Sequence, residues 1–370
     1  MKNINTDFKN KEYVQKLIHQ IECEIDDRQA YRIMEFCGGH THSICSYALD
    51  DILPSNIKLI HGPGCPVCVL PAGRLKMAID LAKQEDIVLC SYGDMMRVPA
   101  AKQSLLSTKA QGADIRMVYS PLQCMEIARD NPNKQIVFLA IGFETTTPAT
   151  AVLLQKSNEA NLDNISVFCN HVTTPAALDV ILKRKNLPID ALIGPGHVSL
   201  ITGLGIFEQA IKMNPKPICI SGFEPVDLLS SIYALVQQIN RKEAYVENKY
   251  ERAVIKEGNL KAQALMAKFF ELRPQFAWRG LGSIKNSGLA IAPKYEKFDA
   301  EKRFMMEEIE LKDPKACQCS DIILGLAEPF ECKVFGNKCT PENPIGSCMV
   351  SGEGACAAYY QYKKMDYSVS

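Results

Sequence analysis

The apolar positions of this chain follow two patterns. Up to about residue 30 they recur at helical spacing, which predicts one helix: Tyr13, Val14, Leu17, Ile18, Ile21 and Ile25. Beyond it, short apolar runs typical of strands alternate with amphipathic helical stretches. The runs cover residues 32–36, 57–61, 87–91, 115–119, 136–141, 165–170, 191–193 and 217–221. This alternation predicts βαβ units and mainly parallel sheets.

Two parts of the chain repeat one order of motifs. In the first part a strand leads into GPG at 62–64, a helix follows, and the next strand ends near Asp94. In the second part a strand leads into GPG at 194–196, and the strand after the next helix ends near Glu224. The repetition predicts two similar α/β domains. Chance recurrence of a glycine-rich turn is the alternative.

Glycine-rich segments follow most of the predicted strands. They read EFCGGHTH, HGPGCPVC, SYGDMMRVP, AIGFETT, GPGHVS and SGFEP in chain order. Ligands of open α/β sheets bind outside the carboxyl ends of the strands, and glycine lets the backbone approach them closely. We therefore expect these segments to converge on shared clefts. Asp94, Arg97, Glu144, Thr145 and Thr146 are candidates for the cleft walls, although caps and turns would explain them equally well.

Charge and targeting signals exclude several classes of function. Lys plus Arg equals Asp plus Glu at 42 each, so no basic excess indicates a nucleic acid or an anionic membrane as partner. The N-terminus has no apolar signal region, and no apolar run is long enough to span a bilayer. We expect a cytoplasmic protein, in a compartment where structural disulfides are rare.

Fifteen cysteines are therefore more than structure requires. Six that lie singly in apolar surroundings are predicted to be core residues: Cys23, Cys45, Cys90, Cys124, Cys169 and Cys219. Six others crowd the irregular C-terminal region: Cys317, Cys319, Cys332, Cys339, Cys348 and Cys356.

The C-terminal cysteines are predicted to bind a 4Fe–4S cluster, which needs four thiolates on flexible, Gly- and Pro-rich backbone. The preferred ligands are Cys317, Cys332, Cys339 and Cys356, with spacers of 14, 6 and 16 residues. Cys319 could take the place of Cys317. A structural zinc site is the alternative, but zinc favours close CxxC pairs, which these spacings lack.

Two further motifs carry reactive groups. Cys65 and Cys68 form a CxxC that follows a strand and opens a helix, where the helix dipole lowers thiol pKa values. Such a pair can cycle between dithiol and disulfide or bind a soft metal. The CGGHTH motif places Cys37 beside two imidazoles, of which His40 is the stronger candidate for metal or acid–base chemistry. His61 and His197 are weaker candidates.

Glu353 lies three residues before Cys356 and could relay protons to a buried redox site, although a solvated loop carboxylate explains it as well.

These motifs resemble the HypD family of hydrogenase formation and maturation proteins along nearly the whole chain. The resemblance rests on MEFCGGHTH, HGPGCPVCV, YGDMMRVP, GADIRMVYSP, IGFETTTPA, GPGHVS, GFEPVDLL, WRGLG and CTPENPIGSCMVSGEGACAAYY. One departure is Gly352, where the family usually has Ser.

The resemblance implies a scaffold that assembles the Fe(CN)2CO group of NiFe hydrogenases together with a HypC-type chaperone and a HypE-type cyanide donor. Cys37, Cys65 and Cys68 would be the iron-site and redox cysteines, with Cys37 and Cys68 holding the iron. His40 and Glu353 would be essential accessory residues, and the C-terminal cysteines would hold a 4Fe–4S cluster.

The predicted fold is α/β, with two similar Rossmann-like domains of mainly parallel sheets and a C-terminal iron–sulfur domain. The expected bounds are 1–30 for a helix that packs on the C-terminal domain, then 31–135, 136–240 and 241–370. Two other functions remain open. One is an independent thiol–disulfide oxidoreductase resembling ferredoxin:thioredoxin reductase, and the other is a zinc-stabilised interaction module.

Overall fold

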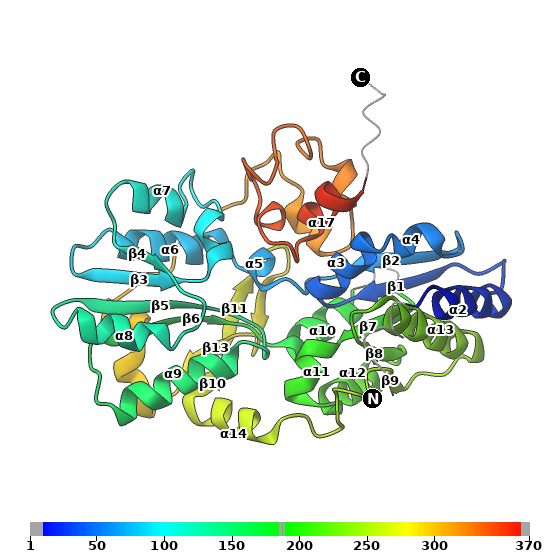
Figure 1. Ribbon diagram of the computed structural model, residues 1–370, viewed down its shortest axis with the longest axis horizontal. Helices are drawn as coiled ribbons and strands as arrows, with labels where there is room; N and C mark the ends of the chain where they lie inside the picture. Colours follow the sequence, from blue (N-terminus) through cyan, green and yellow to red (C-terminus); the bar gives the residue numbers. More distant parts are fainter. Residues whose placement is uncertain (1–9, 185–186, 188, 364–370) are drawn as a thin grey trace.

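Two parallel β-sheets form the framework of the computed structural model, which describes residues 10–184, 187 and 189–363 (Figure 1). The five-stranded sheet has the order β2 (Ile57–His61), β1 (Tyr31–Glu35), β7 (Ala191–Pro195), β8 (Ile218–Ser221) and β9 (Val246–Asn248). The four-stranded sheet has the order β4 (Ile115–Met117), β3 (Ile87–Ser91), β5 (Gln135–Gly142) and β6 (Ile165–His171). Every pairing within these two sheets is parallel, which confirms the prediction of an α/β fold.

Strand pairing divides the chain differently from the expected domains. β1 and β2 form one sheet with β7, β8 and β9, whereas β3 and β4 pair with β5 and β6. The expected boundary at residues 135 and 136 therefore falls inside the four-stranded sheet. The repeated GPG motifs also differ in topology, because β2 and β3 belong to different sheets while β7 and β8 are neighbours. A strand's own apolar pattern does not specify its partner.

Helices cover both faces of each sheet, and most strand residues are buried, as is usual for parallel sheets. Around the five-stranded sheet lie α2 (Lys11–Glu24), α3 (Gly38–Ser46), α4 (Leu49–Ile52), α11 (Gly196–Thr202), α12 (Gly205–Met213) and α13 (Pro225–Arg241). The chain leaves this sheet through α5 (Pro66–Val69). The four-stranded sheet is accompanied by α6 (Ala72–Ala82), η1 (Gly93–Arg97), α7 (Leu105–Ala110), α8 (Gln123–Asp130) and α9 (Thr147–Glu159). Helix α10 (Thr174–Leu182), which follows β6, packs on α12.

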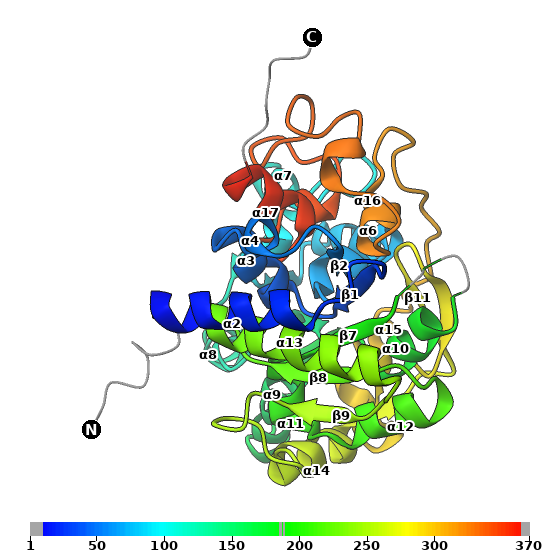
Figure 2. The same ribbon diagram turned by 90° about the vertical axis from the view of Figure 1, so that its right-hand side faces the viewer.

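The N-terminal helix α2 packs along α13, as Figure 2 shows, and not on the C-terminal region as expected. Ile21 is fully buried there, and the Asn240 amide donates to the Glu24 carbonyl oxygen. Only one narrow stripe of α2 is covered, so Cys23 is exposed, and its assignment as a core residue was wrong. The other five cysteines predicted to be core residues are buried.

The chain then returns to the four-stranded sheet. Helix α14 (Leu260–Phe269) packs on α9, and β10 (Phe270–Leu272) pairs antiparallel with β13 (Leu289–Ile291). β11 (Gln275–Trp278) pairs with β12 (Gly282–Lys285), and η2 (Pro293–Phe298) and α15 (Ala300–Arg303) follow. A buried ionic network ties this segment to the sheet. Glu301 accepts hydrogen bonds from Arg273 and, at 2.6 Å, from Arg74, which also donates to Asn170 Oδ1 at 2.6 Å.

The segment 313–363 contains little regular structure and lies over α3 and α5 (Figure 1). Its elements are α16 (Cys319–Ile323), η3 (Pro329–Glu331), η4 (Ser347–Met349) and α17 (Ala355–Tyr362). The α17 helix packs on α3, and η4 packs on α5. The irregular C-terminal region is thus placed against both reactive motifs of the N-terminal part.

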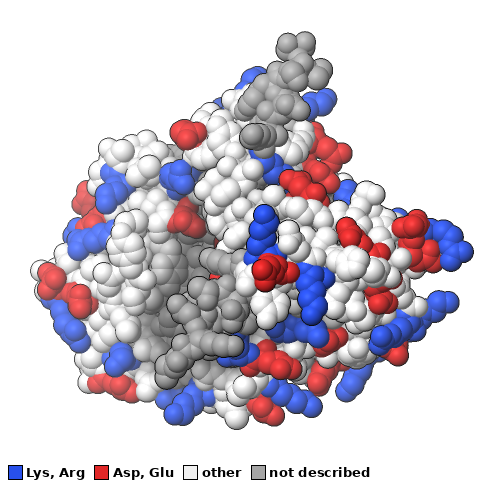
Figure 3. Space-filling model, turned by 45° about the vertical axis from the view of Figure 1, so that its right-hand side comes forward, with Lys and Arg blue, Asp and Glu red and all other residues white. Residues whose placement is uncertain are grey.

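The surface carries mixed charge. On the face in Figure 3, the basic and acidic side chains of the described residues are interspersed. None of the described helices is both long and apolar enough to cross a membrane.

Candidate functional site

A cavity of about 460 Å³ lies between the carboxyl ends of the two sheets. Its walls come from the loops after β1, β2, β3, β5 and β7, together with Ser351 and Glu353 from the C-terminal segment. Strand order reverses between β1 and β7 in one sheet and between β3 and β5 in the other, and ligands bind at such switch points. The predicted convergence of the glycine-rich segments is confirmed for these loops.

Cys37 lies on the cavity wall at the N-terminus of α3. Its backbone N–H donates to Glu35 Oε2 at 2.8 Å. Burial, followed by the carboxylates of Glu353 and Glu35, raises the pKa of the Cys37 thiol to about 12. The thiol is therefore protonated at neutral pH unless a cation takes the place of its proton, as a bound metal ion does.

Two glycines allow the loops around Cys37 to touch. A Cβ atom on Gly64 would lie 2.4 Å from the Cys37 nitrogen, and one on Gly38 would lie 2.4 Å from Glu353 Cβ. Neither space could hold a methyl group without backbone movement. The glycines of the CGGH and GPGC motifs thus bring the thiol, the CxxC loop and Glu353 to one wall.

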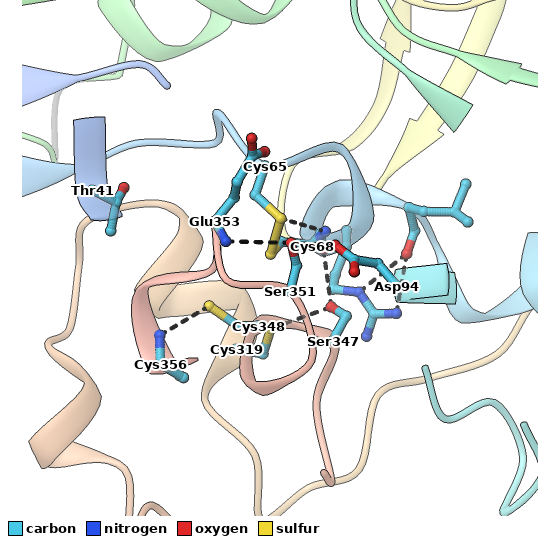
Figure 4. The surroundings of a disulfide bond; sticks show 12 residues. Thr41, Cys65, Cys68, Asp94, Cys319, Ser347, Cys348, Ser351, Glu353 and Cys356 are labelled. Carbon is cyan, nitrogen blue, oxygen red and sulfur yellow. Dashed lines mark hydrogen bonds between the residues drawn. A yellow bond between two sulfur atoms is a disulfide. The ribbon is translucent and has the colours of Figure 1, made fainter. Parts of the chain in front are cut away.

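Cys65 and Cys68 are joined by a disulfide across the short helix α5, with their Cα atoms 5.2 Å apart. Pro66 and Val67, between them, line the large cavity. On the other side, the Ser347 hydroxyl donates to the Cys68 carbonyl oxygen at 3.2 Å. Figure 4 shows the disulfide between Glu353 and the C-terminal cysteines. The CxxC motif therefore separates the cavity from the cysteine-rich segment.

Glu353 lines the large cavity as an exposed residue that the cavity walls enclose only in part. This partial burial, and next the carboxylates of Asp94 and Glu35, raise its pKa above the ordinary value of a glutamate. Its backbone N–H donates to Ser351 Oγ at 3.3 Å, and the Ser351 hydroxyl donates to Asp94 Oδ2 at 3.0 Å. A carboxyl group at this place can exchange protons with groups in the cavity.

His40 is fully buried behind the cavity wall. Its Nε2 lies 3.3 Å from the Ser221 carbonyl oxygen, and Nδ1 has no hydrogen-bond partner among the described residues. Burial lowers its pKa to about 4, so the ring is neutral at neutral pH. His197 does line the cavity, and its ring stacks on Phe223 with centroids 3.9 Å apart.

The structure places some of the remaining cleft candidates at the cavity and others away from it. Asp94, Thr145 and Thr146 line the cavity. Glu144 is buried beside it and accepts hydrogen bonds from the Thr174 backbone and hydroxyl at 2.8 and 2.7 Å. Arg97 instead binds the cysteine-rich segment, where it donates to the Pro341 carbonyl oxygen at 2.8 Å.

Six cysteines surround one small, mainly apolar pocket in the C-terminal segment: Cys317, Cys319, Cys332, Cys339, Cys348 and Cys356. Ile322, Phe335 and Met349 complete its walls. Hydrogen bonds from Cys317 and Cys348 lower the pKa of Cys319, and the same bonds raise the pKa values of the two donors. Among residues 10–184, 187 and 189–363, no group of three or more His, Cys, Asp or Glu side chains is arranged around a single metal ion.

The thiols thus surround a space and do not meet at a point. That arrangement, in an apolar pocket on flexible backbone, suits a cysteine-ligated iron–sulfur cluster. All four preferred ligands reach the pocket, and so do Cys319 and Cys348. The choice between Cys317 and Cys319 stays open.

Glu35 was missed in the sequence. It is fully buried at the end of β1, and besides the Cys37 N–H its carboxylate accepts hydrogen bonds from the Thr41 hydroxyl and, at 3.0 Å, from His61 Nδ1. The available signal was a carboxylate directly before CGG, in a run that is otherwise apolar toward its end. Thr41 was missed as well.

Known proteins match this chain along nearly its whole length. The family model HypD, described as the hydrogenase formation hypA family, matches residues 12–363. The chain belongs to the HypD family. It is 52% identical over 363 residues to hydrogenase maturation factor HypD2 of Bradyrhizobium diazoefficiens, with 96% of each chain covered. HypD of Azotobacter vinelandii is 50% identical, with 98% of this chain and 97% of the relative covered.

HypD of Escherichia coli is 43% identical, with 90% of each chain covered. These matches span both sheets and the cysteine-rich segment. The general role of HypD proteins, hydrogenase maturation, therefore applies to this chain.

Proposed function

We propose that this chain is the scaffold on which the Fe(CN)2CO group of NiFe hydrogenases is assembled. The observation that carries the proposal is the shared wall of the central cavity, where Cys37, the CxxC loop and Glu353 meet at the switch points of both sheets. Thiolates are strong donors and suit an iron ion that must accept cyanide and carbon monoxide.

The iron, as cargo, is held by Cys37 and Cys68. Cys68 can donate to iron only after the disulfide is reduced, which takes two electrons and two protons and yields two thiols. The redox state of the Cys65–Cys68 pair therefore decides whether the iron site is complete. Glu353 exchanges protons with the cavity, and His40 orients the loop behind Cys37 as a neutral ring.

The cysteine pocket is proposed to hold a 4Fe–4S cluster through Cys317, Cys332, Cys339 and Cys356, with Cys319 as the alternative to Cys317. Such a cluster supplies one electron at a time. The hydrogen bond from Ser347 to the Cys68 carbonyl oxygen keeps the pocket and the CxxC pair in direct contact.

Two proteins are proposed as partners. A HypC-type chaperone would share the iron at the mouth of the cavity, and a HypE-type protein would donate cyanide. The support is the family relationship and the opening of the cavity at the surface, where Tyr119 is 83% exposed.

The test compares Cys37→Ala with Cys219→Ala, a matched change of a fully buried cysteine on β8. Both full-length variants are purified without oxygen from cells that contain the partners. We expect Cys37→Ala to lose the infrared bands of iron-bound cyanide and carbon monoxide and to keep the cluster spectrum, while Cys219→Ala keeps both. Retention of the cyanide bands in Cys37→Ala would refute the assignment.

A second function is favoured by one observation, the contact of the disulfide with the cysteine pocket. An independent thiol–disulfide oxidoreductase would use the same two groups. It predicts catalytic reduction of a soluble disulfide protein without any HypC-type partner. Absence of turnover, with the cluster present, eliminates it.

A further inference from the structure

His61 lies between two cavities on the side of the CxxC motif away from the iron site. One is a small cavity of about 10 Å³, close to the space that one water molecule requires. Its walls include Thr41, His61, the two disulfide cysteines and Cys348. The other, of about 50 Å³, is lined by His61 and Tyr359 and by the surface residues Lys58, Glu328 and Glu331. His61 and Glu353 both line the inner cavity, and because His61 also lines the outer one, it is a polar link between the disulfide and solvent on this side.

Hydrogen bonds fix the orientation of this ring. Nδ1 faces Glu35 Oε1 at 3.0 Å, and the carboxylate can only accept, so Nδ1 carries the hydrogen. Nε2 lies 3.3 Å from Tyr359 Oη. Burial raises the pKa of Tyr359, so its hydroxyl remains a donor and Nε2 an acceptor. The nitrogen that can take up a further proton thus faces the cavity that opens to the surface.

The chemistry of the disulfide requires such a group. Reduction breaks the bond between Cys65 Sγ and Cys68 Sγ, takes two electrons from a one-electron reductant and takes two protons to give two thiols. The disulfide is buried, since Cys65 is 4% and Cys68 1% exposed. The protons must therefore be carried in by the protein or by enclosed water.

We propose that His61, held by Glu35, is the proton relay of the Cys65–Cys68 disulfide. It takes up protons at Nε2 from the Tyr359 side when the disulfide is reduced and returns them on oxidation, and the water-sized cavity, lined by His61 and by Thr41, whose hydroxyl donates to Glu35, connects the ring with the disulfide. The proposal rests on the proposed thiol redox function. Glu35 acts as a positioning residue, because it touches the ring and not the sulfur atoms.

The charged neighbours of His61 fit this role. Glu35 approaches from β1, Tyr359 from α17, and the Lys58–Glu328 ion pair at 3.1 Å lies with Glu331 at the outer cavity. Glu353 lines the inner cavity. Acidic groups on both sides favour the passage of a positively charged proton over that of an anion.

The test uses full-length, cluster-loaded protein and reduced methyl viologen as the one-electron donor. Free thiols at Cys65 and Cys68 are counted over time by acid quench, alkylation and mass spectrometry. We expect His61→Asn to slow disulfide reduction roughly 100-fold, in the range for loss of a general acid, and the midpoint potential at fixed pH to stay unchanged. Tyr359→Phe, which keeps the ring and removes the hydroxyl, is expected to slow it by a smaller factor.

Chemical rescue separates proton transfer from a structural role. Added imidazole should restore the rate of His61→Ala, and His171→Asn, a change at another buried histidine, should leave the rate unchanged. A wild-type rate in His61→Asn overturns the proposal, and so does a slow His61→Ala that imidazole does not rescue. If His61→Asn fails to fold, a wild-type rate in Tyr359→Phe overturns it.

A separate measurement tests the proposed thiol redox function, on which the relay rests. If Cys65→Ala cells lose hydrogenase maturation and His61→Asn still reduces its disulfide at the wild-type rate, the relay is refuted and the proposed function stands. Full maturation in Cys65→Ala cells removes the thiol redox function and the relay with it.

Discussion

Gly38 sets how closely the Cys37 loop approaches the C-terminal segment. The space where its Cβ would lie is occupied by Glu353, with the Glu353 carbonyl oxygen 2.7 Å and Cβ 2.4 Å away. This contact joins two segments more than 300 residues apart in the chain. Because Gly38 carries only a hydrogen atom where other residues have Cβ, the Cys37 thiol and the Glu353 carboxyl group can line the same wall of the cavity.

We expect Gly38→Ala to lower the free energy of unfolding by about 1–3 kcal/mol, the usual cost of overpacking, and to reduce hydrogenase maturation strongly. Urea denaturation and hydrogenase activity of complemented cells measure the two effects. Gly352→Ala is the control, because no atom lies within 4 Å of its Cβ position. Wild-type behaviour of Gly38→Ala would contradict the close contact.

His171 gives a pH dependence that is independent of the cysteine sites. It is buried, Nε2 lies 2.9 Å from Thr150 Oγ1, and burial lowers its pKa to about 4 from an ordinary value of 6.5. Between these values the unfolded chain binds a proton that the folded chain does not bind. Stability must therefore fall as the pH falls from 6.5 to 4.

The share of His171 amounts to at most about 3.5 kcal/mol over that interval, from about 1.4 kcal/mol per pH unit. Urea denaturation of His171→Asn across the same pH range should show a flatter decline than that of the wild type. Parallel curves would show that another group, such as His40, carries the dependence.

Sequence alone identified most residues of the central wall. Cys37, Cys65, Cys68 and Glu353 stand in glycine-rich segments, and the structure places them around one cavity and its CxxC wall. Glu35 and Thr41 were not identified because their roles appear only in the fold, where Glu35 binds the Cys37 N–H and His61 and the Thr41 hydroxyl donates to Glu35. His40 was expected in the open cleft, but the turn of α3 directs it behind the wall.

Among the elements, the ionic network of Arg74 connects α6, β6, β10 and α15. Its side chain is 6% exposed and that of Glu301 is 17% exposed. Removal of one member of such a group leaves a buried charge without its partner.

We expect Glu301→Ala to cost about 3–5 kcal/mol of stability, the range for breaking a buried ion pair. Lys297→Ala, which breaks the exposed pair with Asp163, should cost less than about 1 kcal/mol. Thermal or urea unfolding of the two variants provides the comparison. Equal effects would show that the network does not hold these elements together.

Strands β1 to β8 were predicted within two residues of their ends because each has a short apolar run followed by glycine or polar residues, whereas β9 to β13 were not predicted. The pairing partners of the predicted strands were not predicted either. β1 pairs with β7, and its Arg32 N–H donates at 2.8 Å to Asp190, 158 residues further along the chain. Packing across that separation chooses the partner, and no local pattern records it.

For the whole molecule, the segment 313–363 is the part in which the proposed cluster would matter most for stability. It has short helices and long irregular stretches, so it buries little regular structure by itself. We expect the proposed cluster to stabilise the folded form of this segment, since an unfolded chain does not present the site.

Removal of iron by a chelator should therefore expose this segment before either sheet. Limited trypsin digestion, followed by mass spectrometry, is expected to cut apoprotein within residues 313–363 and to leave cluster-loaded protein intact there. Far-ultraviolet circular dichroism should change little, because the sheets persist. First cuts within β3–β6 would contradict the dependence.

The division of the chain between two sheets also sets the order in which they can form during synthesis. The four-stranded sheet is continuous from residue 87 to 171, whereas β1 and β2 must wait for β7 at residue 191. Domains fold as the ribosome releases them, N-terminal parts first. Here the earliest strands are completed late, and Cys37, Cys65 and Cys68 stay without the Glu353 wall until residue 353 has been made. A nascent chain that has not reached this residue therefore lacks one wall of the central cavity.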